Sequence, residues 1–101
     1  MASIDVYPMP GHARRRYVLD VQADLLASLI TRTVVPLLPE GDVRDALQDL
    51  NPVFEIDGTR HVMLTQAIAT VPRRELGDGV ASLLQHHHIV LRALDILFTG
   101  I

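Results

Sequence analysis

The strongest pattern in the sequence is a helical one, and it is confined to the C-terminal end. Ser82 and Gln85 form a capping-box pair, which predicts a helix start there because the two side chains can satisfy amide groups of the first turn. Gly100 follows the last periodic residue, where a glycine commonly ends a helix. The residues at helical spacing are Leu84, His87, Leu91, Leu94 and Phe98, flanked by Leu83, Val90 and Leu97.

The residues before this helix are divided into short extended runs by turn residues. Residues 53–56 and 59–64 are joined by Asp57-Gly58, a dipeptide typical of type I′ hairpin turns. Residues 3–7 and 16–22 alternate between apolar and polar side chains, and they predict a second hairpin with a long tip.

Three further segments complete the extended part of the chain. Residues 32–38 are β-branched and then apolar, but Pro36 predicts that this run is an edge strand, a bulge or a strand end. Residues 68–71 form one more short extended piece. Residues 25–30 are ambiguous, since they are apolar enough for a helix but few in number.

Residues 42–50 predict a short helix that ends at Asn51-Pro52. Its apolar face consists of Val43, Ala46, Leu47 and Leu50. Several strands followed by one long helix indicate an α+β fold, mainly β, with an antiparallel sheet.

Length and composition indicate one domain, residues 1–101, with an aliphatic core. Hydrophobic residues make up 49% of the chain and only four residues are aromatic. A domain of this size has a modest core, so part of the apolar surface is expected to lie between the subunits of a homodimer.

Charge and cysteine content exclude several classes of protein. The net charge of −3 argues against a dominant nucleic-acid-binding surface, and the absence of cysteine excludes disulfides and thiolate metal sites. We see neither a signal peptide nor an apolar run of the ~20 residues that a membrane span requires, so a cytoplasmic location is expected.

Candidate catalytic and cofactor sites are few. His86-His87-His88 suggests a metal, but consecutive helical residues point about 100° apart and cannot share one ion. We therefore expect no metal site and no cofactor, with His87 hydrogen-bonded in the core or an interface and the other two histidines solvated. The sequence contains neither a Walker loop nor a dinucleotide-binding fingerprint.

Two arginine clusters and an acidic series have both a functional and a structural interpretation. Residues 14–16 and Arg73-Arg74 would suit phosphate contacts, or they are a solvated hairpin tip and a solvated loop. Asp42, Asp45 and Asp49 lack the glycine-containing loop of a calcium site and are expected to form the solvated face of the predicted helix.

Five stretches in the same order and spacing resemble the CcdB family of bacterial toxins. Their most specific parts are Asp20-Val21-Gln22, Val35-Pro36-Leu37 and the final Gly100-Ile101. The stretches are 17–24, 34–37, 50–56, 69–72 and 96–101.

The resemblance implies a fold and partners that the residues alone do not. The fold would be an SH3-like barrel with a long C-terminal helix, in a homodimer. The function would be that of a toxin, not an enzyme, which binds the A subunit of DNA gyrase and traps the cleaved-DNA complex. An antitoxin protein would neutralise it. The gyrase contacts implied by the resemblance are Ala23, Leu25, Asp95, Thr99, Gly100 and Ile101.

The chain departs from the family pattern at three of these positions. Thr99 stands where the family has Trp, Asp95 where it usually has Asn, and Ala23 where it usually has Ser. A Trp stacked on an arginine in a desolvated pocket contributes about 2 kcal/mol, which Thr99 cannot supply.

Three functional hypotheses follow. The first is a gyrase inhibitor suited to its own host's gyrase. The second is a non-toxic or retargeted CcdB-like protein that still dimerises and binds an antitoxin. The third is an endoribonuclease like the MazF-type toxins of the same fold, which only the arginine clusters support.

Overall fold

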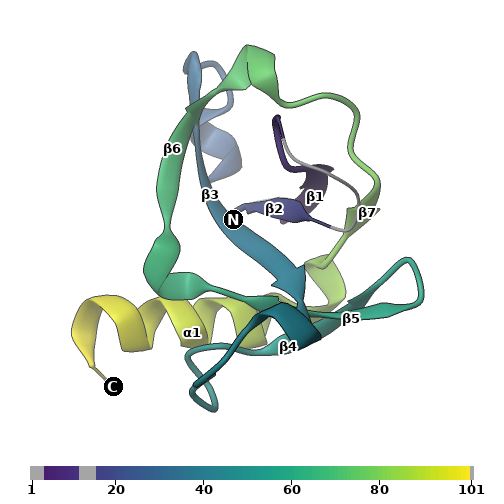
Figure 1. The fold of residues 1–101 in the computed structure, drawn as a ribbon. Helices are drawn as coiled ribbons and strands as arrows, with labels where there is room; N and C mark the ends of the chain where they lie inside the picture. Colours follow the sequence, from purple (N-terminus) through teal and green to yellow (C-terminus); the bar gives the residue numbers. More distant parts are fainter. Residues whose placement is uncertain (1–3, 12–15, 101) are drawn as a thin grey trace.

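The computed structural model describes residues 4–11 and 16–100, which form a curved antiparallel sheet and one C-terminal helix (Figure 1). Seven strands have the order β4-β5-β3-β2-β1-β7, with β6 paired to β3 outside this path. The sheet curls into a nearly closed barrel, which confirms the predicted α+β, SH3-like architecture. The strands are β1 (Asp5–Pro8), β2 (Tyr17–Asp20), β3 (Thr31–Pro39), β4 (Val53–Ile56), β5 (Thr59–Met63), β6 (Ala69–Pro72) and β7 (Ala81–Ser82).

The helical elements of residues 4–11 and 16–100 are one α-helix and five single 3₁₀ turns. They are η1 (Asp24–Leu26), η2 (Glu40–Asp42), η3 (Thr65–Ala67), η4 (Arg73–Glu75), η5 (Leu84–His86) and α1 (His87–Thr99). Within the described residues, none of these helices has the length and apolar character needed to cross a bilayer.

Strand β3 is the centre of the sheet and runs the height of the molecule in Figure 1. One side pairs with β2, whereas the other pairs with β6 over residues 31–34 and with β5 over residues 37–39. Pro36 lies where the partner changes, and its carbonyl oxygen accepts a bond of 2.9 Å from the Leu64 amide. Its nitrogen faces the same side, so the missing N–H falls in the gap between the two partners. The predicted edge, bulge or strand end at Pro36 is therefore wrong.

Both predicted hairpins are present. Strands β4 and β5 pair across Asp57 and Gly58, whose φ angles of 52° and 77° are those of a type I′ turn. Strands β1 and β2 also pair, and the Met9 amide donates to the Arg16 carbonyl at 2.9 Å. The extended piece at residues 68–71 corresponds to β6.

The predicted helix over residues 42–50 is wrong. The chain makes the single turn η2 and then an irregular loop, in which Asp45 and Asp49 have φ angles of 57° and 71°. The buried Asn51 organises this loop: its Oδ1 accepts from the Leu47 amide, and its Nδ2 donates to the Met63 carbonyl, both at 3.0 Å. The Asn51 side chain thus holds this segment as a loop through one local bond, to Leu47, and one tertiary bond, to Met63.

The helix also begins later than its capping-box pattern predicts. Ser82 belongs to β7, and its Oγ accepts a 3.2 Å bond from the Leu84 amide. The residues that follow form η5, and α1 begins at His87 without a side-chain cap on His86. Pairing of β7 with β1 extends the chain where the capping box would have started a helix. The predicted end is correct, because Gly100 has φ 76° and donates to the Ile96 carbonyl at 2.9 Å.

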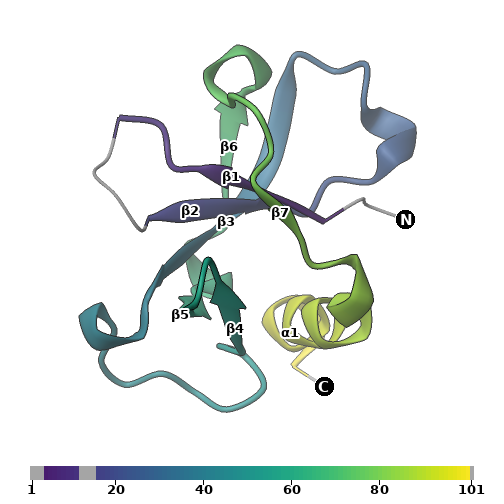
Figure 2. The same ribbon diagram turned by 90° about the vertical axis from the view of Figure 1, so that its right-hand side faces the viewer.

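Helix α1 lies beside the β4–β5 hairpin (Figure 2), and it buries one flank of the predicted stripe, which includes Val90, instead of the side that carries Leu91 and Phe98. Val90 and Ala93 are its buried residues, with Ile89 and Leu94 partly buried against the core. Leu84, Leu91 and Phe98 remain exposed. The helix therefore has two apolar faces, and the sequence alone does not distinguish the one that packs from the one that faces outward.

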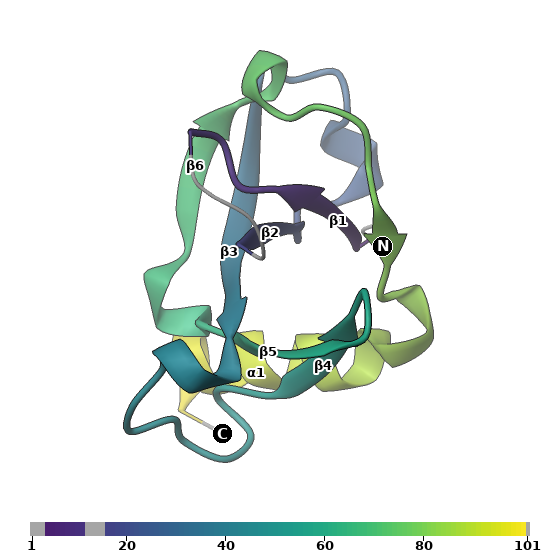
Figure 3. The same cartoon turned by 45° about the vertical axis from the view of Figure 1, so that its right-hand side comes forward.

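The core lies between the curled sheet and α1, whose arrangement Figure 3 shows from a third side. Its members come from both halves of the sheet and from the helix. They are Ile4, Val6, Leu19, Val35, Leu37, Phe54, Ile56, Met63, Leu83, Val90 and Ala93.

The β4–β5 turn gives a direct test of the fold. Replacing Gly58 with Ala places a Cβ on a residue with φ 77°, a conformation that is strained for L-residues. The free energy of unfolding, measured by urea denaturation, should therefore fall by about 1 kcal/mol. Gly41→Ala is the matched control, because Gly41 lies in η2 with open space around it and no left-handed φ. We expect Gly41→Ala to be neutral or slightly stabilising. Equal losses in the two variants would contradict the type I′ assignment.

Candidate functional site

The loop between β2 and β3, residues 21–30, displays apolar side chains to solvent. Leu25 is 90% exposed and Ile30 is 77% exposed. The segment that was ambiguous in the sequence forms only the single turn η1, and no residue of η1 is buried. Large apolar side chains gathered at one exposed place mark an interaction surface.

The C-terminal end of α1 adds a second apolar contribution. Phe98 is 68% exposed although it is one of the largest apolar side chains of the chain. Phe98 and the partly buried Leu94 line an open groove of ≈ 380 Å³ together with Leu26 and Leu29 of the loop. The groove therefore joins the helix end to the 21–30 loop, two segments far apart in the sequence.

The floor of the groove comes from the β3–β6 ladder. Thr33 and Thr70 are paired across the two strands, and Thr31 lies two residues along on the same face. Ile68 borders the groove where β6 begins. Hydroxyls between two apolar walls can orient a partner through hydrogen bonds while the walls bury its apolar side chains.

The residues implied by the resemblance divide between this groove and its surroundings. Ala23 lines the groove, and Leu25 lies on the same loop. Asp95 and Thr99 line a shallow hollow on the adjacent flank of α1, beside Leu91. Gly100 ends the helix. Ile101 lies outside the described residues.

Thr99 uses its polar group within the helix. Its Oγ1 donates to the Asp95 carbonyl at 2.6 Å, the usual bond of a threonine to the preceding turn. The side chain therefore offers a partner mainly its methyl group, a much smaller contact than an aromatic ring.

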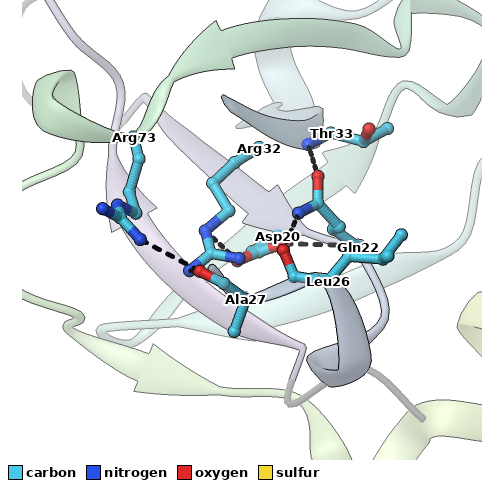
Figure 4. A network of polar contacts seen from close by, with 7 residues as sticks. All are labelled: Asp20, Gln22, Leu26, Ala27, Arg32, Thr33 and Arg73. Atoms are coloured by element: carbon cyan, nitrogen blue, oxygen red, sulfur yellow. Dashed lines mark hydrogen bonds and ion pairs between the residues drawn. The ribbon is translucent and has the colours of Figure 1, made fainter. Parts of the chain in front are cut away.

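A polar network holds the exposed 21–30 loop (Figure 4). The Ala27 carbonyl accepts from Arg32 Nη2 and from Arg73 Nη1, each at 3.0 Å. Arg32 also lies 3.8 Å from the carboxylate of Asp20. Gln22 joins the loop to β3, because its Nε2 donates to the Leu26 carbonyl and its Oε1 accepts from the Thr33 amide.

Asp20 titrates unusually within this network. Burial raises the pKa of Asp20 above its ordinary value, and the Gln22 amide and the Arg32 guanidinium offset that rise only in part. The carboxylates of Asp5 and Asp24 add to it. Ionising the Asp20 carboxyl group therefore costs more free energy in the folded protein than in the unfolded chain.

Sequence reasoning missed several residues of this site. Helical spacing puts Phe98 and Leu94 on one stripe without showing which side of the helix packs, and Leu26 and Leu29 lie in a segment that the sequence leaves ambiguous. The sequence does contain one signal for the helix residues of the site. The apolar residues of α1 cover more of its circumference than a single packing contact can bury. The contact of Arg32 and Arg73 with one carbonyl oxygen had no sequence signal, although Arg73 belongs to a noted arginine cluster, because the acceptor is a backbone group.

Among the described residues, the histidines at 86–88 and Arg16 do not line the groove. His86 and His88 are exposed as predicted, whereas His87 lies partly buried on the outer side of α1, its Nδ1 3.1 Å from the Leu84 carbonyl. In the described ranges no three His, Cys, Asp or Glu side chains gather where a metal could bind. Arg16 faces Asp42 at 3.5 Å, and Arg14 and Arg15 lie outside the described residues.

Comparison with known families identifies the family of the chain. A family model described as CcdB protein matches residues 3–100, almost the whole chain. The chain belongs to the CcdB family. CcdB proteins are toxins of bacterial toxin–antitoxin modules and are not a family of catalytic enzymes.

The pKa of Asp20 predicts how this CcdB-family chain responds to pH. The folded state binds the proton more tightly than the unfolded state, so the stability due to Asp20 is fully present below the unfolded-state pKa, about 4, and is lost as pH rises through the folded-state value. Asp20→Asn keeps an acceptor for the Gln22 amide but cannot ionise. The unfolding free energy of the natural chain minus that of the variant should therefore fall with rising pH, as measured by urea denaturation. A difference that rises with pH would mean that attraction to Arg32 outweighs burial.

Proposed function

We propose that this chain is the toxin of a toxin–antitoxin module and that it inhibits DNA gyrase by binding the A subunit and trapping the cleaved-DNA complex. The observation that carries the proposal is the exposed apolar groove shared by the 21–30 loop and the end of α1. The implied contacts Ala23, Leu25, Asp95 and Thr99 lie in or beside it.

The groove suits a protein partner better than a small molecule. Its apolar walls are open, and Leu25, Ile30 and Phe98 stand out from the surface instead of lining an enclosed cavity. Exposed apolar anchors of this kind dominate the free energy of protein–protein binding when they are buried at the centre of an interface. The proposal includes no catalytic step and no cofactor.

The proposed working form is a homodimer located in the cytoplasm. A core of this size is small for an independent domain, and the outward apolar face of α1 together with the groove offers surface for a second copy and for gyrase. An antitoxin protein that covers the same groove would neutralise the toxin by competing with gyrase.

The test uses the host's own gyrase and the purified protein, which should have the mass of a dimer by light scattering. Gyrase, supercoiled plasmid and protein should yield linear DNA after detergent and protease treatment, and induction in the host should arrest growth. Leu25→Ser should lower the yield of linear DNA by about tenfold or more, because it removes an apolar side chain from the proposed interface. Leu47→Ser is the matched control, an exposed leucine on the 43–52 loop. Absence of linear DNA and of growth arrest with the natural chain would refute the proposal.

A second candidate function is a CcdB-like protein that dimerises and binds an antitoxin but has lost gyrase as its target. The observation that favours it is Thr99, whose hydroxyl is bound within the helix and whose side chain lacks an aromatic ring.

Thr99→Trp separates the two candidates. If gyrase is the target, this variant should bind a gyrase A fragment about 30-fold more tightly than the natural chain, a gain of about 2 kcal/mol from a cation–π stack. Calorimetry measures both affinities, and Thr99→Val controls for loss of the hydroxyl alone. If neither the natural chain nor Thr99→Trp binds the fragment, while an antitoxin peptide binds both, the second candidate is correct.

A further inference from the structure

Residues 23–30 of the exposed loop lie on the surface without an apolar core beneath them, whereas Val21 at the start of the loop packs against the core. No residue of η1 is buried, and Leu25 and Ile30 point into solvent. Segments with few buried apolar contacts open at a small cost in free energy. The conformation of this loop must therefore depend on its polar contacts.

Two of these side-chain contacts share one backbone atom, the Ala27 carbonyl oxygen (Figure 4), while Gln22 bonds the Leu26 carbonyl. Arg32 reaches it from β3 and Arg73 reaches it from η4, both at 3.0 Å. Arg32 and Arg73 are 41 residues apart in the chain. Both hydrogen bonds have a positively charged donor, and such bonds are stronger than hydrogen bonds between neutral groups.

Arg73 fastens the loop through its backbone as well as its side chain. Its amide donates to the Ile30 carbonyl at 2.8 Å, directly after the last β3–β6 pair, Thr31 with Pro72. The side chain then extends back to Ala27. A single residue thus joins both the middle and the end of the loop to the end of β6.

We propose that Arg73 is a positioning residue that holds the 21–30 loop in the conformation in which it binds its partner. A loop already ordered loses less conformational entropy on binding, so the ordering contributes to affinity without a contact to the partner. The inference rests on the proposed function for the use of the loop, whereas the ordering itself is a property of the isolated protein.

The surroundings of Arg73 make it a suitable probe. Its side chain is exposed, so its removal takes no apolar contact from the core. The Arg32 side chain is largely buried beside Asp20, and changing it would disturb β3 as well. Arg74 offers a matched control, because it is an exposed arginine in the same turn and is not one of the two donors to Ala27.

The experiment compares Arg73→Met, Arg73→Lys and Arg74→Met with the natural full chain. Hydrogen exchange of the amides at residues 24–30 should quicken about three- to tenfold in Arg73→Met, less in Arg73→Lys, and not in Arg74→Met. Exchange within α1 and the thermal midpoint should stay unchanged in all three variants. Affinity for a gyrase A fragment should weaken by a similar factor in Arg73→Met alone.

The two readouts separate the failure of this inference from failure of the proposed function. Unchanged exchange at residues 24–30 in Arg73→Met overturns the positioning role whatever the fragment does. Faster exchange with an unchanged affinity also overturns it, because the ordering would then not serve binding. Faster exchange when even the natural chain does not bind the fragment supports the ordering by Arg73 and refutes gyrase as the partner.

Discussion

The change of partner along β3 is the constraint on which the rest of the structure depends. Strand β3 keeps β2 on one side throughout, and on the other side it passes from β6 to β5 at Pro36. Because Pro36 has no N–H to donate, the gap between β6 and β5 leaves no strand-pairing donor unsatisfied. The residue that a sequence argument treats as incompatible with a central strand is the one that suits this junction.

The candidate site follows from the same strand. The β6-paired half of β3 supplies the floor of the groove, and the loop that enters β3 supplies one wall. The β5-paired half supports the hairpin on which α1 packs, and α1 supplies the other wall. Apolar side chains of the loop and of the helix end can therefore remain exposed without weakening the core, since the buried residues lie elsewhere.

Much of the fold was predictable because it rests on local signals. Asp57-Gly58 specifies its turn through two positive φ angles, and Gly100 ends α1 in the left-handed conformation that glycine adopts readily. The errors occurred where tertiary contacts override local preference. Asn51 draws residues 43–50 into a loop, and pairing of β7 with β1 delays the start of α1.

The sequence by itself determined the fold class, the hairpins, the terminal helix and, through motifs shared along the chain, the CcdB family. It also placed Ala23, Leu25, Asp95 and Thr99 among the candidates for binding. Only the tertiary structure decided which apolar face of α1 is buried, since helical spacing is the same for a face that packs on a sheet and for a face that awaits a partner. Only the tertiary structure brings Arg32 and Arg73 to the Ala27 carbonyl. Every residue has a backbone carbonyl, so the residue types do not indicate which one accepts these bonds.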